Sequence, residues 1–187
     1  MQECGDAESA DETLPQSLSV TWQRERSLRY GENPHQSAAL YRQSSHAGAT
    51  LASSHPLQGK ALSYNNLLDA DAAWQLANRW HDQMSCVIVK HGNPCGAALA
   101  DSVAEAYRAA LACDSQSAFG GIIACNGEVD EAVAQLMSGL FAEVIIAPGF
   151  SEAARDIFSK KKNLRLLPVL SPATRKNNAW PWDIRCI

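Results

Sequence analysis

Long apolar runs and paired cysteine motifs are missing from this chain of 187 residues. No stretch approaches the roughly 18 consecutive apolar residues that a membrane-spanning helix needs. The six cysteines form no CxxC pair and lie mostly inside apolar runs, which favours buried free thiols over a disulfide framework. His91, Cys95, Cys113 and Cys125 are residue types that can bind zinc, so a zinc site is one alternative. Nothing in their spacing requires a metal.

Basic residues are missing from the start of the chain, since the first Lys or Arg is Arg24, while five acidic residues precede it. This pattern predicts a disordered acidic tail over residues 1–20. It disfavours a signal peptide, which begins with basic residues, and a mitochondrial presequence, which is rich in Arg. We therefore expect a cytoplasmic protein that is not bound to a membrane. The remainder of the chain is close to neutral and has no basic stripe, so we expect no nucleic-acid partner.

Helical and strand patterns alternate along the middle of the chain. Apolar residues recur at helical spacing over 65–80, after polar residues that can cap a helix start. Further helices are predicted at 102–112, 130–141 and 151–162, and strands at 86–90, 121–125, 144–147 and 164–167. This alternation predicts a layered α/β fold with parallel strand pairs over 21–167. The pattern ends near Pro168, and residues 168–187 stay unassigned.

Lys90 and His91 stand at the end of a short β-branched strand and precede the turn residues of segment 92–96. Ligands of open α/β sheets collect beyond the carboxyl ends of strands, so this base and cation are candidates for chemistry. Gly92 and Gly96 permit a positive φ or a close backbone approach. The alternative is that the pair is only a solvated strand end.

Two further loops and one carboxylate could contribute to a site. Arg29 and Tyr30 combine a phosphate-binding fork with an aromatic ring, which suits a nucleotide-like ligand, although the loop could equally be a simple capping turn. Gly120 closes a polar loop where a ligand could meet backbone amides. That loop is neither a Walker loop nor a GxGxxG fingerprint. Glu143 precedes a strand, and its alternative role is a solvated strand start.

Five segments together resemble one known family. They are RYGENPHQ at 29–36, QGKALSYNN at 58–66, VIVKHGNPCG at 87–96, SAFGGIIA at 117–124 and EVIIAPG at 143–149. In this order they resemble the formyltransferase region of the AICAR transformylase/IMP cyclohydrolase family of purine biosynthesis. The resemblance implies an α/β/α sandwich of the cytidine-deaminase-like type without catalytic zinc. It also implies a homodimer with active sites at the subunit interface.

The resemblance further implies roles for individual residues. His91 would be the general base and Lys90 the cation in formyl transfer from 10-formyltetrahydrofolate to the 5-amino group of AICAR, which gives FAICAR. Arg29, Tyr30, His91, Gly120 and Glu143 would contact AICAR. A neutral imidazole can accept the amine proton and an ammonium group can stabilise developing charge, so the roles suit the residue types. No metal is required.

The resemblance covers the first of two deaminase-like halves of the formyltransferase region. We expect this chain to contain neither the second half nor the cyclohydrolase domain, so turnover by the chain alone is in question. The alternative is an inactive truncated remnant or a ribotide-binding module. A zinc deaminase is disfavoured because Pro94-Cys95 is not followed by the second cysteine of a PCxxC motif.

Overall fold

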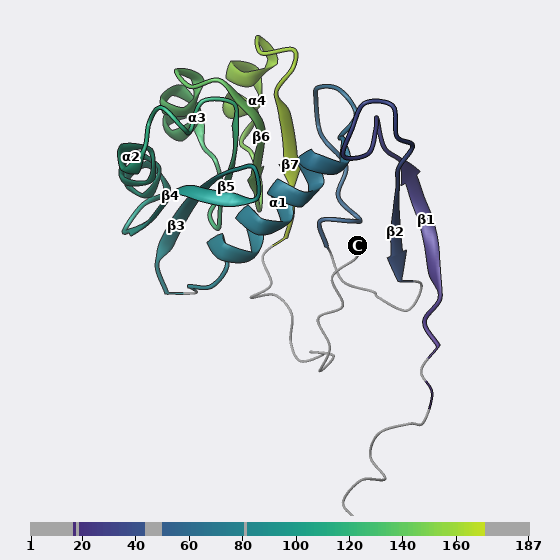
Figure 1. Cartoon of the computed structure of the whole chain (residues 1–187). Coiled ribbons are helices and arrows are strands. Elements are labelled where there is room, and N and C mark those ends of the chain that lie inside the picture. The colour runs from purple at the N-terminus through teal and green to yellow at the C-terminus, as the bar shows by residue number, and fades with distance from the viewer. Residues whose placement is uncertain (1–16, 18, 44–49, 81, 171–187) are drawn as a thin grey trace, which may run out of the picture.

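The computed structural model describes residues 17, 19–43, 50–80 and 82–170. Nearly all of the predicted acidic tail (1–20) and most of the tail 168–187 therefore lie outside the described residues. The described chain forms a five-stranded mixed sheet with helices on both faces and a separate two-stranded hairpin (Figure 1). The predicted layered α/β fold is thereby confirmed. Of the helices described, none has the length and apolar character needed to cross a bilayer.

The central sheet combines antiparallel and parallel pairing. Across the sheet its strands are β4 (Asn93–Ala100), β3 (Met84–Lys90), β5 (Gly121–Cys125), β6 (Ala142–Ala147) and β7 (Arg165–Pro168). Strand β3 pairs antiparallel with both β4 and β5, whereas β5, β6 and β7 are parallel. The four predicted strands and the parallel pairs are present.

Strand β4 corrects the expectation of a glycine-rich turn over 92–96. The turn consists of only His91 and Gly92, and pairing resumes with Asn93 opposite Lys90. Proline is tolerated here because β4 lies at the edge of the sheet. Gly96 does allow a close backbone approach, but the group that approaches it belongs to the protein and not to a ligand. A Cβ at this position would lie 2.1 Å from the carbonyl oxygen of Ala110. The glycine lets helix α2 (Val103–Cys113) pack directly on β4.

Each helix begins at a residue whose side chain accepts a hydrogen bond from the first turn. Helices α1 (Tyr64–Ala77), α2, α3 (Glu131–Ser138) and α4 (Glu152–Ser159) have the N-caps Ser63, Ser102, Asp130 and Ser151. These caps satisfy backbone N–H groups that have no partner within the helix, which fixes where each helix starts. The starts agree with prediction, while α1, α3 and α4 end about three residues earlier than predicted.

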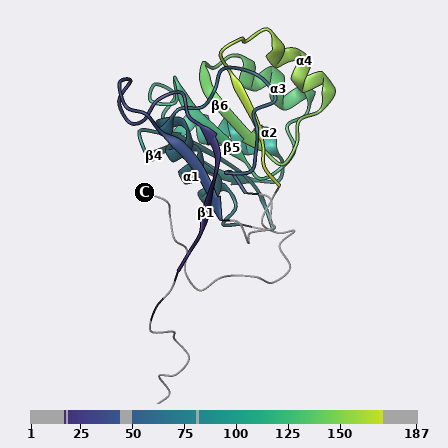
Figure 2. The ribbon, with the colours of Figure 1, turned by 90° about the vertical axis from the view of Figure 1, so that its right-hand side faces the viewer.

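The sheet separates two apolar layers because successive side chains of its buried strands point to opposite faces. Ile88, Ile123 and Ile145 face the layer formed with α2, α3 and α4. Val89, Ile122 and their neighbours face α1. In Figure 2, α1 lies on one side of the sheet, and α2, α3 and α4 lie on the other. Both faces of β5 are covered, which explains its continuous apolar sequence.

A hairpin of β1 (Trp22–Ser27) and β2 (Ala39–Gln43) lies apart from the main sheet and was not predicted. Leu28 and Leu40 pack against the apolar layer of α1. The backbone N–H of Arg29 donates to the carbonyl of Leu62, and that of Tyr64 donates to the carbonyl of Tyr30. These contacts hold the loop between the two strands beside the N-terminus of α1.

Candidate active site

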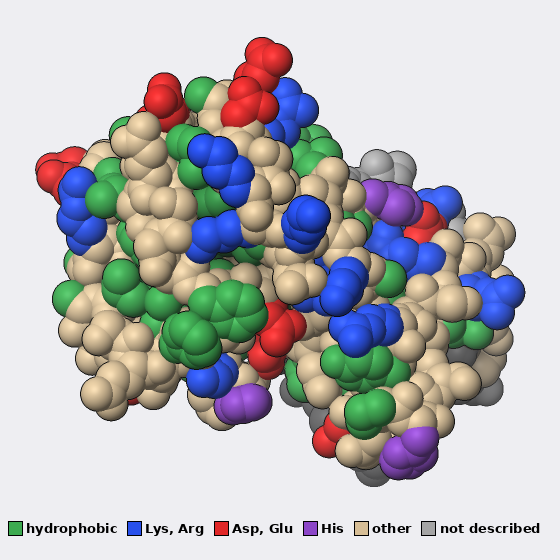
Figure 3. All heavy atoms as spheres, turned by 90° about the horizontal axis from the view of Figure 1, so that it is seen from above, with side chains coloured by type: hydrophobic (Ala, Val, Ile, Leu, Met, Phe, Trp, Pro, Cys, Tyr) green, Lys and Arg blue, Asp and Glu red, His purple; other side chains and the backbone are tan. Residues whose placement is uncertain are grey.

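The strand directions bring three predicted site segments to one end of the sheet, namely the Lys90–His91 pair, the Gly120 loop and Glu143. The carboxyl end of β3 lies beside the amino ends of β5 and β6, because β3 is antiparallel to β5. We call this the site end, defined by Lys90, Gly121, Ala142 and Arg165. Lys90 lies at the carboxyl end of β3, as predicted, and the site end also contains the amino ends of the parallel strands β5, β6 and β7. Figure 3 looks down from above, where hydrophobic, basic, acidic and His side chains lie close together.

His91 occupies an uncommon backbone conformation. Its φ is 54°, and that of Gly92 is 76°, so both residues of the hairpin turn are in the left-handed region. Two-residue hairpins favour such turns because their twist matches the strands, and Gly92 meets this requirement without strain. His91 carries a Cβ and is strained by comparison. The imidazole is thus held at the tip of an exposed turn.

Hydrogen bonds from two other residues fix this turn. The Asp69 carboxylate, on α1, accepts a 2.6 Å hydrogen bond from the Gly92 backbone N–H. The Asn93 side-chain amide donates to the carbonyl oxygen of His91 at 3.0 Å. Asp69 lies far from the turn in sequence, and its part in the site was not predicted.

Lys90 connects the turn to the loop that contains Gly120. Its ammonium group donates to the carbonyl oxygen of Phe119 at 2.8 Å. Gly120 has a φ of 77°, and its N–H donates to the carbonyl of Phe141 at 2.8 Å. The Gly121 N–H likewise bonds the carbonyl of Ala118. We expected the backbone amides of this loop to be free to bind a ligand. This expectation is wrong for Gly120 and Gly121, because their N–H groups both donate to carbonyls of the protein.

Glu143 is the extra residue of a β-bulge. Gly121 pairs with Ala142 and Ile122 pairs with Val144, which leaves Glu143 without a partner on β5. Bulges of this kind redirect a side chain and are frequent next to active sites. Here the carboxylate Oε2 accepts a 2.7 Å hydrogen bond from the side chain of Asn66, on α1. Glu143 is thus part of a network rather than a solvated strand start.

Arg165 is a buried cation beside this carboxylate. Its Nη1 lies 3.6 Å from Oε2 of Glu143, and its other nitrogens donate to the carbonyls of Lys60 and Ala61. Burial lowers the pKa of Arg165, and the carboxylate of Glu143 opposes this shift. The sequence does contain a hint of this role, because Arg165 is a single charged residue in an otherwise apolar strand. A buried charge of this kind requires a partner of opposite charge or hydrogen bonds.

Arg29 and Tyr30 approach the same network from the hairpin loop. The Arg29 guanidinium lies 5.2 Å from the centre of the Tyr30 ring, a distance suited to a cation–π contact. Arg29 further lowers the pKa of Arg165, whereas Tyr30 raises it, so both lie within electrostatic range of that guanidinium. The predicted residues therefore form two groups, one around Lys90 and one around Glu143.

The first turns of α1 connect the two groups. Tyr64 bonds the Tyr30 carbonyl through its backbone, Asn65 donates to the Glu32 carbonyl, and Asn66 bonds Glu143. Asp69, one turn later, holds Gly92. The sequence pattern identified this helix start and its cap, but a local pattern carries no information about which distant loops a helix end will contact.

The described cysteines are all free thiols. Cys86 and Cys125 are buried as predicted, whereas Cys95 is partly exposed and Cys113 is exposed. Burial raises the pKa of the Cys95 thiol. Within the described ranges, no three His, Cys, Asp or Glu side chains are grouped closely enough to hold a metal ion, so the zinc alternative has no support there.

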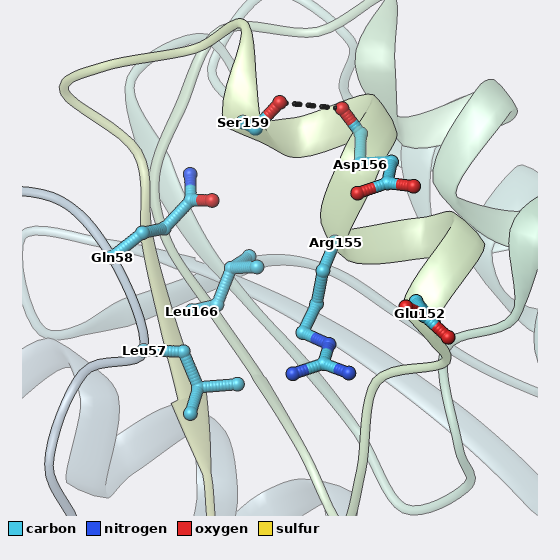
Figure 4. A pocket seen from close by; sticks show the side chains of 7 residues that line it. All are labelled: Leu57, Gln58, Glu152, Arg155, Asp156, Ser159 and Leu166. Atoms are coloured by element: carbon cyan, nitrogen blue, oxygen red, sulfur yellow. Dashed lines mark hydrogen bonds between the residues drawn. The ribbon is translucent and has the colours of Figure 1, made fainter.

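A pocket of about 360 Å³ lies between α4, β7 and the segment before α1 (Figure 4). It is lined by Leu57, Gln58, Glu152, Arg155, Asp156, Ser159 and Leu166. None of the predicted site residues lines it. The Gln58 amide also donates to the carbonyl of Phe158 at 3.0 Å, so it helps to fix the end of α4.

The chain is similar to some solved structures and to one protein family. Among solved structures, a putative formate dehydrogenase accessory protein from Desulfotalea psychrophila is similar at a TM-score of 0.43 and 11% identity, over 56% of this chain and 54% of that one. RibD from Acinetobacter baumannii gives 0.40 and 15%, over 53% and 35%. A dCMP deaminase from cyanophage S-TIM5 gives 0.36 and 11%, over 52% and 88%. The match thus spans about half of the first of these chains and about a third of the second.

One family model matches nearly the whole sequence, whereas each of these structures covers only about half of it. The match is to the AICARFT/IMPCHase bienzyme family and covers residues 2–185, which includes all the segments quoted above. It extends beyond the predicted domain bounds of 21–167, which stay a prediction. The chain therefore belongs to the AICARFT/IMPCHase bienzyme family, whose enzymes act in purine biosynthesis.

Proposed function

We propose that this chain acts in the transfer of a formyl group from 10-formyltetrahydrofolate to the 5-amino group of AICAR. The observation that supports this most is the grouping of Lys90, His91, Gly120 and Glu143 at the site end, with Arg29 and Tyr30 close to the Glu143 network. Family membership supports the same assignment.

In the proposed reaction the amine nitrogen attacks the formyl carbon, and a new C–N bond forms. His91 takes a proton from the amine as this bond forms, because the amine is a weak nucleophile next to an electron-withdrawing ring. The bond between the formyl carbon and N10 of the folate then breaks, and the proton that His91 took from the amine passes to N10, directly or through water. Lys90 stabilises negative charge on the formyl oxygen during this exchange. The step uses two side chains of this chain and no metal.

The nucleotide is proposed to lie along the second group of residues. The Arg29 guanidinium suits a phosphate, and Tyr30 offers a ring and a hydroxyl beside it. The Glu143 carboxylate would accept a hydrogen bond from the substrate. A homodimer in the cytoplasm is the proposed working form, with the partner subunit completing the site.

Formyl transfer by the purified full chain tests the proposal, with product measured by mass spectrometry. His91→Ala should lower the rate by about 10²–10⁴-fold, the usual contribution of a general base. Lys90→Ala should lower it by about 10²–10³-fold. His55→Ala and Lys160→Ala, on exposed residues outside the site, are the controls. Equal rates for all five proteins would refute the assignment, and AICAR binding without turnover by the unaltered chain would favour the ribotide-binding alternative.

A further inference from the structure

Arg165 is the most deeply buried cation of the described chain, and its environment is unusual. The residue is 5% exposed, although it lies on the edge strand β7 next to the site end. A buried guanidinium is costly unless charges and hydrogen bonds compensate for its lost hydration. Arg165 has such compensation on two sides: Glu143 faces one nitrogen, and two backbone carbonyls accept from the others.

The contacts of Glu143 are confined to one of its two oxygens. Oε2 receives both the amide of Asn66 and the guanidinium of Arg165. Among the described residues, no hydrogen bond reaches Oε1. The Glu143 side chain is nevertheless 43% exposed, whereas that of Arg165 is 6% exposed. The buried cation therefore holds Oε2, while part of the Glu143 side chain stays exposed.

From this asymmetry we infer that Arg165 is a positioning residue for Glu143. It fixes Oε2, together with Asn66, so that Oε1 points outward to accept a hydrogen bond from an N–H or O–H donor of the bound ribotide. The identity of the ligand rests on the proposed function, whereas the positioning itself does not. A carboxylate held in advance loses less conformational entropy on binding than one that must be ordered by its ligand.

The same guanidinium connects Glu143 to the hairpin loop that contains Arg29 and Tyr30. The carbonyls of Lys60 and Ala61, which Arg165 holds, immediately precede Leu62, and the Leu62 carbonyl accepts from the Arg29 backbone. Arg165 is thus bonded to both the carboxylate and the segment that supports Arg29. Removing it should disturb ligand binding rather than the proton transfer at His91.

Binding of AICAR to the full chain, measured by titration calorimetry, tests the inference. Arg165→Met keeps an unbranched apolar stem but removes the cation, and it should weaken binding by about 10-fold to 100-fold, because small misplacements of binding groups have effects of this size. Arg165→Lys keeps the charge without the fork, and it should recover part of the loss. Arg155→Met, an exposed arginine on α4, is the matched control and should bind like the unaltered chain.

A double-mutant cycle separates positioning from a general structural role. In a Glu143→Gln background the carboxylate is gone, so Arg165→Met should weaken AICAR binding clearly less than it does in the unaltered chain, because only the support of the Arg29 segment is still lost. A purely structural arginine would cause the same loss in both backgrounds, and that result would overturn the inference. Thermal melting of each variant identifies any that fail to fold, in which case Arg165→Lys replaces Arg165→Met in the cycle.

Crystal structures without ligand give a readout that does not depend on AICAR. In Arg165→Met or Arg165→Lys the Glu143 carboxylate should leave the position it has in the unaltered chain, or lose its contact with Asn66. An unchanged carboxylate in both variants would overturn the inference. If the unaltered chain fails to bind AICAR, the proposed function fails, and the crystal structures alone still decide whether Arg165 positions Glu143.

Discussion

The Lys90 ammonium donates a 2.8 Å hydrogen bond to the carbonyl oxygen of Phe119, and this contact joins two parts of the candidate site that are 29 residues apart. The carbonyl is presented by a loop that ends at Gly120, whose φ of 77° turns the chain into β5. The Phe119 ring packs on that of Phe141 with 5.2 Å between centroids. The position of the cation therefore depends on the backbone conformation of a neighbouring glycine.

Gly120→Ala should impair formyl transfer through this dependence. A Cβ at Gly120 would have room, since its nearest neighbours are ring atoms of Phe141 at 3.7 Å and beyond, but the positive φ makes it strained. We expect a loss of about 1 kcal/mol in the free energy of unfolding, measured in urea. The rate should fall as the Phe119 carbonyl moves away from Lys90.

The matched control for this substitution is Gly139→Ala. Gly139 follows α3 with an ordinary φ of −72°, so an added methyl group brings no backbone strain. It should leave both stability and rate close to those of the unaltered chain. Similar losses in the two variants would show that the conformation of Gly120 is not what matters.

Gly96→Ala should destabilise the fold much more than Gly92→Ala. At Gly96 the new Cβ would lie 2.1 Å from the Ala110 carbonyl oxygen, so α2 must move away from β4. We expect a loss of about 3 kcal/mol or more in the free energy of unfolding. At Gly92 nothing lies within 4 Å, and only the positive φ opposes a side chain, at a cost of about 1 kcal/mol. Urea denaturation of both variants measures the difference, and equal losses would contradict this packing argument.

The sequence predicted the central elements well because their signals are local. The strand at 121–125 is present with the predicted bounds, since a short apolar run between turn residues has few alternatives. Ser102 caps α2 as predicted, because its side chain and Glu105 have the spacing of a capping box. Lys90 likewise ends a strand and His91 follows it, as the pattern predicted.

The features that were missed depend on contacts across long stretches of sequence. A buried strand shows no alternation of polar and apolar residues, so nothing in EVIIA indicates that a bulge redirects Glu143. Strand β4 was taken for a loop because its glycine and proline usually break strands, and the packing of α2 on Gly96 overrides that preference. Asp69 and Arg165 act through partners that only the fold brings close.

Tyr107→Phe should stabilise the protein. Tyr107 is 2% exposed, and its hydroxyl has no hydrogen-bond partner among the described residues. Burying an unpaired hydroxyl is unfavourable, so its removal should raise the free energy of unfolding by about 1 kcal/mol at neutral pH. Tyr41→Phe, which alters an exposed tyrosine, should have no measurable effect and serves as the control.

The same residue should make stability fall at alkaline pH. Burial, with a smaller contribution from Cys86 and Cys125, raises the pKa of Tyr107 to about 12, against about 10 in an unfolded chain. Between these values the unfolded chain loses the proton while the folded chain keeps it, so stability decreases as pH rises. The advantage of Tyr107→Phe should grow by about 2–3 kcal/mol by about pH 12. Parallel pH profiles of denaturation for the two proteins would contradict this.

Asp69→Ala should slow formyl transfer much more than it weakens AICAR binding, because His91 is only one of several residues expected to contact AICAR. The Asp69 carboxylate accepts the Gly92 N–H at 2.6 Å, and it thereby holds the turn in which His91 has its left-handed backbone. Without this acceptor the turn can relax toward a less strained conformation, and the imidazole moves away from the position required for proton transfer. We expect a rate about 10-fold to 100-fold lower, since a displaced catalytic group has effects of this size. Because Asp69 is only half-buried, the fold should lose no more than about 1 kcal/mol.

Asp71→Ala is the matched control for Asp69→Ala, because Asp71 lies on the same helix but accepts a hydrogen bond from Gln75 and not from the turn. It should retain full activity. Asp69→Asn keeps an oxygen acceptor at the same place, so it should recover much of the rate. If Asp69→Asn were as slow as Asp69→Ala, the negative charge rather than the hydrogen bond would be the contribution of Asp69. If Asp69→Ala kept the full rate, the turn would need no anchor, because the Lys90–Asn93 strand pair and the Asn93 bond to the His91 carbonyl would hold His91 unaided.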